Sequence, residues 1–297
     1  MTAYRCAAAS RRRHEPVIAT ASRVDRWLLV EQPGPWGPQA PPRSRLRPPL
    51  LDALRRQAAE AGARLLLVRR PSRVARAEAR HVFYVDSRPG RERLLLRVAT
   101  DDELPALGLP DAGAPAAAWS GSPAPLLLVC THGRHDPCCA IRGRPVAAAL
   151  ATSFPDTTWE CSHVGGDRFA ANLLVLPAGL YFGRVPPHEA TAVIRQVLAG
   201  RLAAEYFRGR SSFSGPGQAA QHFARATLGV DGVDDLTPLH QERVDGERWR
   251  VVLRARPRDV VVTVRRSLRS DGEPLTCHAG EPTAHSVYNL VDLTLGA

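Results

Sequence analysis

Two loops rich in cysteine and histidine constrain this chain most, because each one follows a run that predicts a buried strand. Residues 126–129 are continuously apolar, and the first loop, residues 130–139, carries three cysteines and two histidines directly after them. The second loop, residues 161–169, begins at the last residue of the predicted strand 157–161. Thiolates and imidazoles gathered at such positions suit a transition metal or an iron–sulfur cluster.

The composition places the rest of the chain around these loops as a scaffold. The 297 residues are 44% hydrophobic, which is enough for one large or two smaller domains. No run approaches the roughly 18 to 20 apolar residues of a membrane span, and no secretory segment follows the basic first 13 residues. We therefore expect a cytoplasmic protein, in which six cysteines indicate metal, redox or buried thiols instead of disulfides.

The net charge of +11 comes entirely from arginine, since the sequence has no lysine. The arginines are scattered, few aromatic residues lie among them, and no helix-turn-helix or zinc-finger spacing is present. Nucleic-acid binding is therefore not expected. The positive charge instead suits docking to an acidic redox partner.

Periodicity and turn signals predict an α/β fold in several parts. They separate a disordered leader (1–22), an N-terminal α/β region (23–104), a linker rich in Pro, Gly and Ala (105–124), a central domain (125–202) and a strand-rich C-terminal extension (203–297). The central domain reads as strand, helix (140–151), strand, hairpin and helix (188–202). A crossover helix between the first two strands implies a parallel pair, which is a thioredoxin-like layout.

Spacing within the two loops restricts which residues share a site. Nine positions separate Cys130 from Cys139, too many for a compact zinc knuckle. Cys138 and Cys139 are adjacent, so only one of them is expected to be a ligand. Cys161 and His163 are two apart, which puts them on the same face of a strand, and two glycines then let Asp167 return to that site.

Four interpretations are compatible with this pattern. The cysteines are simply buried, or they hold a structural zinc ion in a binding module, or Cys138 and Cys139 serve a thiol-dependent oxidoreductase. In the fourth, the loops bind a 2Fe-2S cluster through mixed Cys and His ligation. The zinc interpretation has the right residue types at poor spacing, and adjacent cysteines form only strained disulfides.

The same residues resemble a known family. Segments 130–139, 142–145, 162–173 and 179–183 are similar to the sucrase/ferredoxin-like family, which is related to thioredoxin-like 2Fe-2S ferredoxins. The similarity is looser over 23–37 and recurs at 208–211. It implies an electron carrier with a 2Fe-2S cluster, more than a catalyst, and no catalytic residue is assigned.

The resemblance also implies a ligand set. The two loop cysteines of the family correspond to Cys130 and Cys139, and the first histidine of its H-x-G-G-H motif corresponds to His163. The second histidine is replaced here by Asp167. Either Cys161, favoured by its softness, or Asp167, favoured by its place in the motif, is expected as the fourth ligand.

Other residues carry weaker signals. Cys6 falls in the expected leader and Cys277 beside a predicted strand, and both read as residues without a role at the site. His132 and His135 lie in the first loop, where they can hydrogen-bond to sulfur or carry protons.

Overall fold

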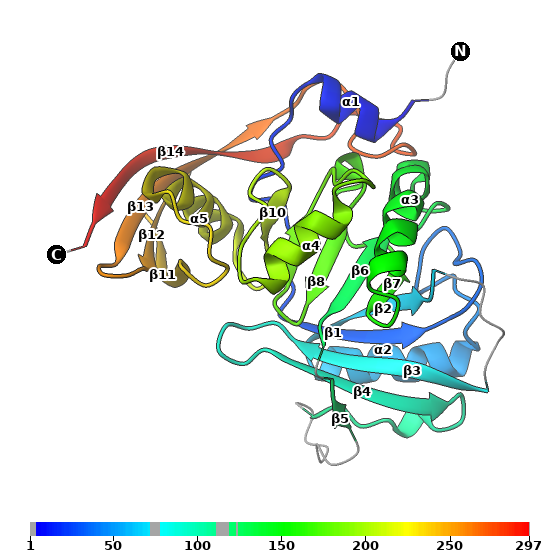
Figure 1. The fold of residues 1–297 in the computed structure, drawn as a ribbon. Helices are drawn as coiled ribbons and strands as arrows, with labels where there is room; N and C mark the ends of the chain where they lie inside the picture. The colour runs from blue at the N-terminus through cyan, green and yellow to red at the C-terminus, as the bar shows by residue number, and fades with distance from the viewer. Residues whose placement is uncertain (1–3, 72–77, 111–118, 123, 297) are drawn as a thin grey trace.

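The computed structural model describes residues 4–71, 78–110, 119–122 and 124–296, and it shows an α/β chain with two sheets (Figure 1). Ten strands form the larger sheet. They are β1 (Arg26–Glu31), β2 (Ala63–Arg69), β3 (Ala79–Asp86), β4 (Arg93–Thr100), β5 (Ser120–Gly121), β6 (Leu126–Cys130), β7 (Thr158–Cys161), β8 (Leu173–Leu176), β9 (Leu180–Phe182) and β10 (Phe207–Arg210). Their order is β10-β9-β8-β6-β7-β2-β1-β3-β4-β5.

Five α-helices and a smaller sheet complete the described chain. The helices are α1 (Cys6–Arg12), α2 (Pro48–Glu60), α3 (Pro137–Ser153), α4 (Ala190–Leu198) and α5 (Gly215–Leu228). The smaller sheet is antiparallel, in the order β11 (Thr237–Arg243), β12 (Arg248–Arg254), β13 (Val260–Arg269) and β14 (His285–Leu295). Short 3-10 turns occur at η1 (Leu104–Ala106) and η4 (Asp167–Phe169). In the described part of the chain, no helix is long and apolar enough to cross a bilayer.

The central unit has the predicted order of strand, helix, strand, hairpin and helix. β6 and β7 are parallel, whereas β6 and β8, and β8 and β9, are antiparallel. Alternate residues of β6 face opposite sides of the sheet. Leu127 and Val129 pack with α3 and α4, while Leu128 and Cys130 pack with the core on the other side. Both faces of β6 are buried, which explains its continuous apolar run.

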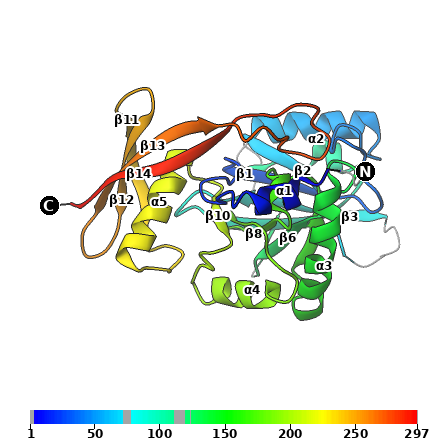
Figure 2. The same ribbon diagram turned by 90° about the horizontal axis from the view of Figure 1, so that it is seen from above.

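The prediction of a disordered leader is wrong for residues 6–12, which form α1 and bury Cys6, Ala7 and Ala9. Small side chains let this helix pack closely against its neighbours, an arrangement that a search for large apolar residues misses. Figures 1 and 2 both place α1 beside the long connection between β13 and β14.

The predicted linker does not separate two sheets. β2 pairs with β7 in antiparallel fashion, so the N-terminal region and the central unit share one sheet. Within 105–124, Leu107 and Leu109 are buried and β5 pairs with the edge of β4. Residues 111–118 and 123 lie outside the described part of the chain.

The C-terminal extension forms a second sheet with its own core. Apolar residues of β12 and β13 pack against Ala219, Ala220 and Ala224 of α5. The extension is strand-rich, as the sequence predicts, and helix α5 precedes its four strands.

Close packing of α3 on β6 generates the first prediction. A Cβ added at Gly143 would lie 2.2 Å from the carbonyl oxygen of Cys130. Gly143→Ala should therefore push α3 away from β6 and lower the free energy of unfolding by about 2 kcal/mol, although alanine favours helices. Denaturant unfolding measures this change. Gly246→Ala, where an added Cβ meets no atom within 4 Å, is the control and should change stability little; equal stability of both variants would contradict the prediction.

Candidate metal centre

The candidate site lies where β6 and β7 end and α3 begins. Cys130 and Cys161 are the last residues of these parallel strands and are direct neighbours across the ladder. The chain then enters α3, whose first turn carries Cys139. Asp136 caps this helix, because its Oδ1 accepts a hydrogen bond from the backbone N–H of Cys138 at 2.8 Å.

Three buried thiols form the inner part of the site. Cys130, Cys139 and Cys161 are at most 1% exposed. Hydrogen bonds from the thiols of Cys139 and Cys161 hold the pKa of Cys130 well below its usual range, although burial opposes this. A hydrogen bond to Cys130 and burial raise the pKa of Cys139. Burial and a hydrogen bond to Cys130 raise the pKa of Cys161. Of the three thiols, Cys130 is therefore the one that loses its proton most readily.

Asp167 joins the thiols to a pair of histidines. Its Oδ1 accepts hydrogen bonds from Cys139 Sγ at 3.1 Å and from His163 Nδ1 at 2.9 Å, while Oδ2 lies 3.5 Å from His135 Nε2. Burial alone would raise the pKa of Asp167, but the two histidines outweigh it and hold that pKa far below its usual range. Asp167 is 2% exposed, so an ionised carboxylate lies buried beside the thiols.

The histidine pair forms the outer part of the site. The rings of His135 and His163 lie 3.8 Å apart between centroids, and their side chains are 30% and 26% exposed. A hydrogen bond to Asp167 raises the pKa of His135. The site thus runs from buried sulfur to imidazoles that reach solvent.

Arg208 is buried next to the second loop and holds it by hydrogen bonds. It is 1% exposed and donates to the carbonyl of Gly165, to Asn172 Oδ1 at 2.8 Å and to Thr20. Gly166 has a φ of +79°, and an added Cβ there would lie 2.3 Å from the Arg208 guanidinium. The glycine pair therefore allows both the turn and the close approach of the arginine.

The structure brings Cys130, Cys139, Cys161, His163 and Asp167 into one contiguous group. Cys138 points elsewhere, since its Sγ lies 3.4 Å from Cys277 Sγ.

Two histidines of the first loop differ in their surroundings. His132 is buried and its Nε2 hydrogen-bonds to the carbonyl of Gly37 at 2.6 Å, so it ties the loop to the N-terminal region. The ring of His135 packs against that of His163, a contact that the sequence did not predict. The sequence placed His135 in the first loop, but only the fold brings it next to the second loop.

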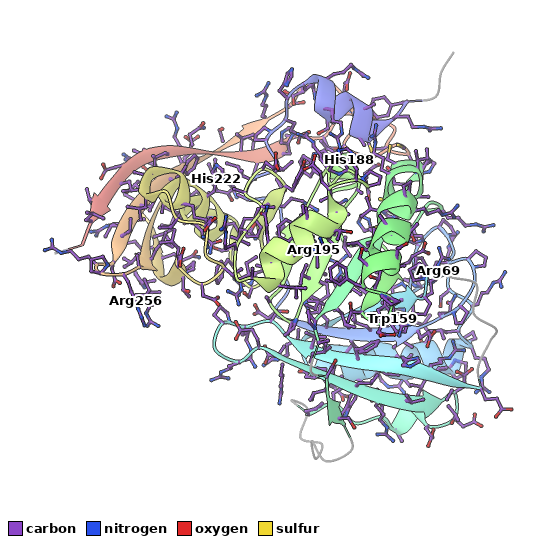
Figure 3. The ribbon with its side chains drawn as sticks, in the orientation of Figure 1. Arg69, Trp159, His188, Arg195, His222 and Arg256 are labelled. Atoms are coloured by element: carbon purple, nitrogen blue, oxygen red, sulfur yellow. The ribbon has the colours of Figure 1, made fainter. Side chains whose placement is uncertain are left out.

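A cavity of about 760 Å³ opens on the side of the sheet next to the first loop. Arg69, Arg70 and Arg144 line it together with Glu31 and Glu160. Arg69 pairs with Glu160 at 2.6 Å and reaches Thr131 Oγ1, the residue after Cys130, at 3.4 Å. Figure 3 labels Arg69 and Trp159, which lie where the lower end of α3 meets β2 and β7.

Comparison with known families assigns the chain. The sucrase/ferredoxin-like family model matches residues 17–209, well over half of its length. The chain belongs to the sucrase/ferredoxin-like family. Comparisons with curated proteins and with solved structures each return no significant match. The matched range includes both loops of this sucrase/ferredoxin-like protein but ends before α5 and the second sheet.

Removing the buried guanidinium should destabilise this family member strongly. Arg208→Leu leaves Asn172 Oδ1 and two carbonyls without their donor inside the protein, and we expect a loss of about 3 kcal/mol in the free energy of unfolding. Arg201→Leu is the control, because Arg201 forms an exposed pair with Asp231 that contributes little. Denaturant unfolding of both variants tests this, and similar losses in the two would refute it.

The carboxylate of Asp167 should also set the protonation of its histidine neighbour. Since a hydrogen bond to Asp167 raises the pKa of His135, Asp167→Asn should lower that pKa. The pairing stabilises the metal-free fold fully below the ordinary histidine pKa of about 6.5 and stops doing so as pH rises through the raised value. NMR titration of the metal-free protein reads the pKa, and an unchanged His135 titration would contradict the assignment.

Proposed function

We propose that this protein is a cytoplasmic electron carrier that binds a 2Fe-2S cluster through Cys130, Cys139, His163 and one further residue. The observation that carries the proposal is the continuous donor set, in which buried thiols contact Asp167 and Asp167 contacts half-buried imidazoles. A mixed set of this kind suits iron, because thiolate and imidazole are both iron ligands in 2Fe-2S centres.

The donor chemistry and the fold both support a cluster. The neighbours of Cys130 lower its pKa, which favours the thiolate form that a metal binds. The central unit has the strand order β9-β8-β6-β7 with a crossover helix, which supports a thioredoxin-like arrangement. The site lies after the first strand of that unit, as expected for thioredoxin-like ferredoxins.

Two residues compete for the fourth ligand position, and each contacts a different member of the set. Cys161 lies within hydrogen-bonding reach of Cys130, and its sulfur is the softer donor. Asp167 touches both Cys139 and His163. If Cys161 is the ligand, Asp167 orients His163 by accepting from its Nδ1, as carboxylates commonly do for metal-bound histidines.

The residues around the site would have different roles in such a carrier. The bound cluster would supply a one-electron redox centre. Burial of the cysteines excludes water from the thiols, whereas the partial exposure of His135 and His163 lets a proton reach an imidazole from solvent. Arg134 is exposed next to His135, and the arginine-lined cavity lies beside Cys130, so both favour an acidic redox partner.

The thiol-dependent alternative finds less support. Cys138 and Cys139 face different neighbours, Cys277 and Asp167, so they do not work as one dithiol.

Anaerobically purified protein tests the proposal directly. We expect about two irons and two sulfides per chain, a visible absorption spectrum and an EPR signal after reduction. A colourless protein whose first site holds only zinc would refute the electron carrier.

Matched variants then identify the fourth ligand. If Cys161 is that ligand, Cys161→Ser loses or shifts the cluster signal and Asp167→Ala retains it. If Asp167 is the ligand, the outcomes reverse, and Asp167→His gives a more stable site. Cys138→Ser should retain the cluster in both cases. Loss of the cluster in Cys138→Ser but not in Cys139→Ser would show that the first loop is assigned one residue out of register.

A further inference from the structure

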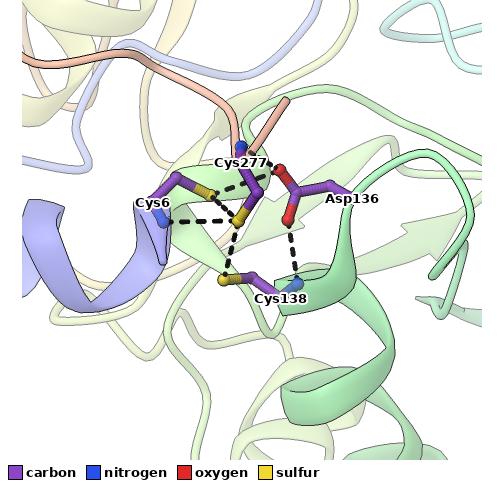
Figure 4. Close-up of side chains that lie close together, drawn as sticks. All are labelled: Cys6, Asp136, Cys138 and Cys277. Atoms are coloured by element: carbon purple, nitrogen blue, oxygen red, sulfur yellow. Dashed lines mark hydrogen bonds between the residues drawn. The ribbon is translucent and has the colours of Figure 1, made fainter. Parts of the chain in front are cut away.

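A second group of thiols gathers on the opposite side of the first turn of α3. Cys6 comes from α1, Cys138 from α3, and Cys277 from the connection between β13 and β14, with Asp136 beside them (Figure 4). Residues 6 and 277 are 271 positions apart, so tertiary structure alone brings them together. Cys6, Asp136 and Cys138 are at most 2% exposed, and Cys277 is half-buried.

The side chains of this group converge on one point. Cys277 Sγ lies 3.4 Å from Cys138 Sγ and 3.5 Å from Cys6 Sγ, and Cys6 Sγ lies 3.4 Å from Asp136 Oδ2. All four donor atoms lie within 4.8 Å of one another. Figure 4 shows the three sulfurs and the carboxylate turned toward a common centre.

These separations match the coordination shell of one tetrahedral ion. With zinc–sulfur bonds of about 2.3 Å, two thiolates on one zinc lie about 3.8 Å apart. A carboxylate oxygen and a thiolate on the same ion lie about 3.6 Å apart. The observed distances are a few tenths of an ångström shorter, so small side-chain rotations would admit the ion.

We propose that Cys6, Cys138, Cys277 and Asp136 form a second metal site that binds a single divalent, thiol-seeking ion such as zinc. The site is separate from the candidate cluster site and involves none of its ligands. Three thiolates and a carboxylate are a donor set that suits zinc. The thiols give up their protons to solvent on binding, and no oxidant or reductant is involved.

Two other uses of the thiols fit the geometry less well. A disulfide would use only two of the three sulfurs and would not involve the carboxylate. An iron–sulfur cluster requires protein ligands on different irons, whereas here the sulfurs lie at the spacing of ligands on one ion. A single ion uses all four groups.

The neighbouring backbone supports the ligands as a metal site requires. The N–H of Cys6 donates to Cys277 Sγ at 3.4 Å, and the N–H of Ala7 donates to Cys138 Sγ. The N–H of Cys277 donates to Asp136 Oδ2 at 2.7 Å. Hydrogen bonds of this kind orient ligands and disperse the negative charge of thiolates.

A metal ion at this second site would link three separate parts of the chain. An ion at this point ties α1 and the β13–β14 connection to the first turn of α3. That turn also carries Cys139, so the two sites share one turn of α3. Tyr4 Oη donates to the carbonyl of Pro274 at 2.7 Å and joins the same two segments beside the site.

Metal analysis of the full-length protein tests this site apart from the first one. We expect about one zinc per chain in addition to iron. Cys277→Ser should weaken zinc binding at least about 100-fold, because losing a direct ligand costs more than losing a residue that only orients a ligand. The iron signal should remain in place. His278→Ala is the matched control, since it removes an exposed neighbouring histidine and should keep the zinc.

The reciprocal variant and the wild-type protein complete the test. Cys161→Ser should keep the zinc, whatever happens to the iron. Alkylation of the wild-type chain, mapped by mass spectrometry, should find Cys6, Cys138 and Cys277 protected until a chelator removes the zinc. This measurement does not depend on the folding of any variant. Zinc retained by Cys277→Ser, a Cys138–Cys277 disulfide in freshly purified protein, or no metal beyond the first site would each overturn the proposal.

Discussion

The capped first turn of α3 is the constraint on which the described functional geometry depends. Asp136 accepts the N–H of Cys138 and begins the helix directly after the loop that follows β6. In a helix, adjacent residues point about 100° apart. Cys138 and Cys139 are thereby directed to different sides, one toward Cys277 and the other toward Asp167. The helical turn that this cap begins separates two groups of thiols.

This separation divides the six cysteines equally. Cys130, Cys139 and Cys161 lie in the core beneath the candidate cluster site, and Cys6, Cys138 and Cys277 lie at the proposed zinc site. The charges around the two groups also differ. The first has a buried carboxylate paired with histidines and a buried arginine next to its glycine turn, whereas in the second backbone N–H groups donate to the carboxylate and to sulfur. The first arrangement suits a change of charge, and the second suits a fixed ion.

Much of the central unit could be predicted because its signals are local. Residues 126–129 are continuously apolar since both faces of β6 are buried, and the hairpin at 177–179 follows from its turn residues. The two-residue spacing of Cys161 and His163, with the glycine pair after them, likewise identified the second loop. Helix α1, in contrast, has no large apolar residues, so its alanine-rich segment left no recognisable periodicity.

The sequence by itself identified the residues proposed for the first site, because strand ends place Cys130 and Cys161 and a motif marks His163 and Asp167. Tertiary structure decided what no local pattern encodes. It packed His135 against His163 and placed Arg208 next to the glycines. It also brought Cys277 to Cys6 and to Cys138 across 271 and 139 positions. Contacts over such separations depend on how sheets and helices pack, and packing is a property of the whole chain instead of any segment.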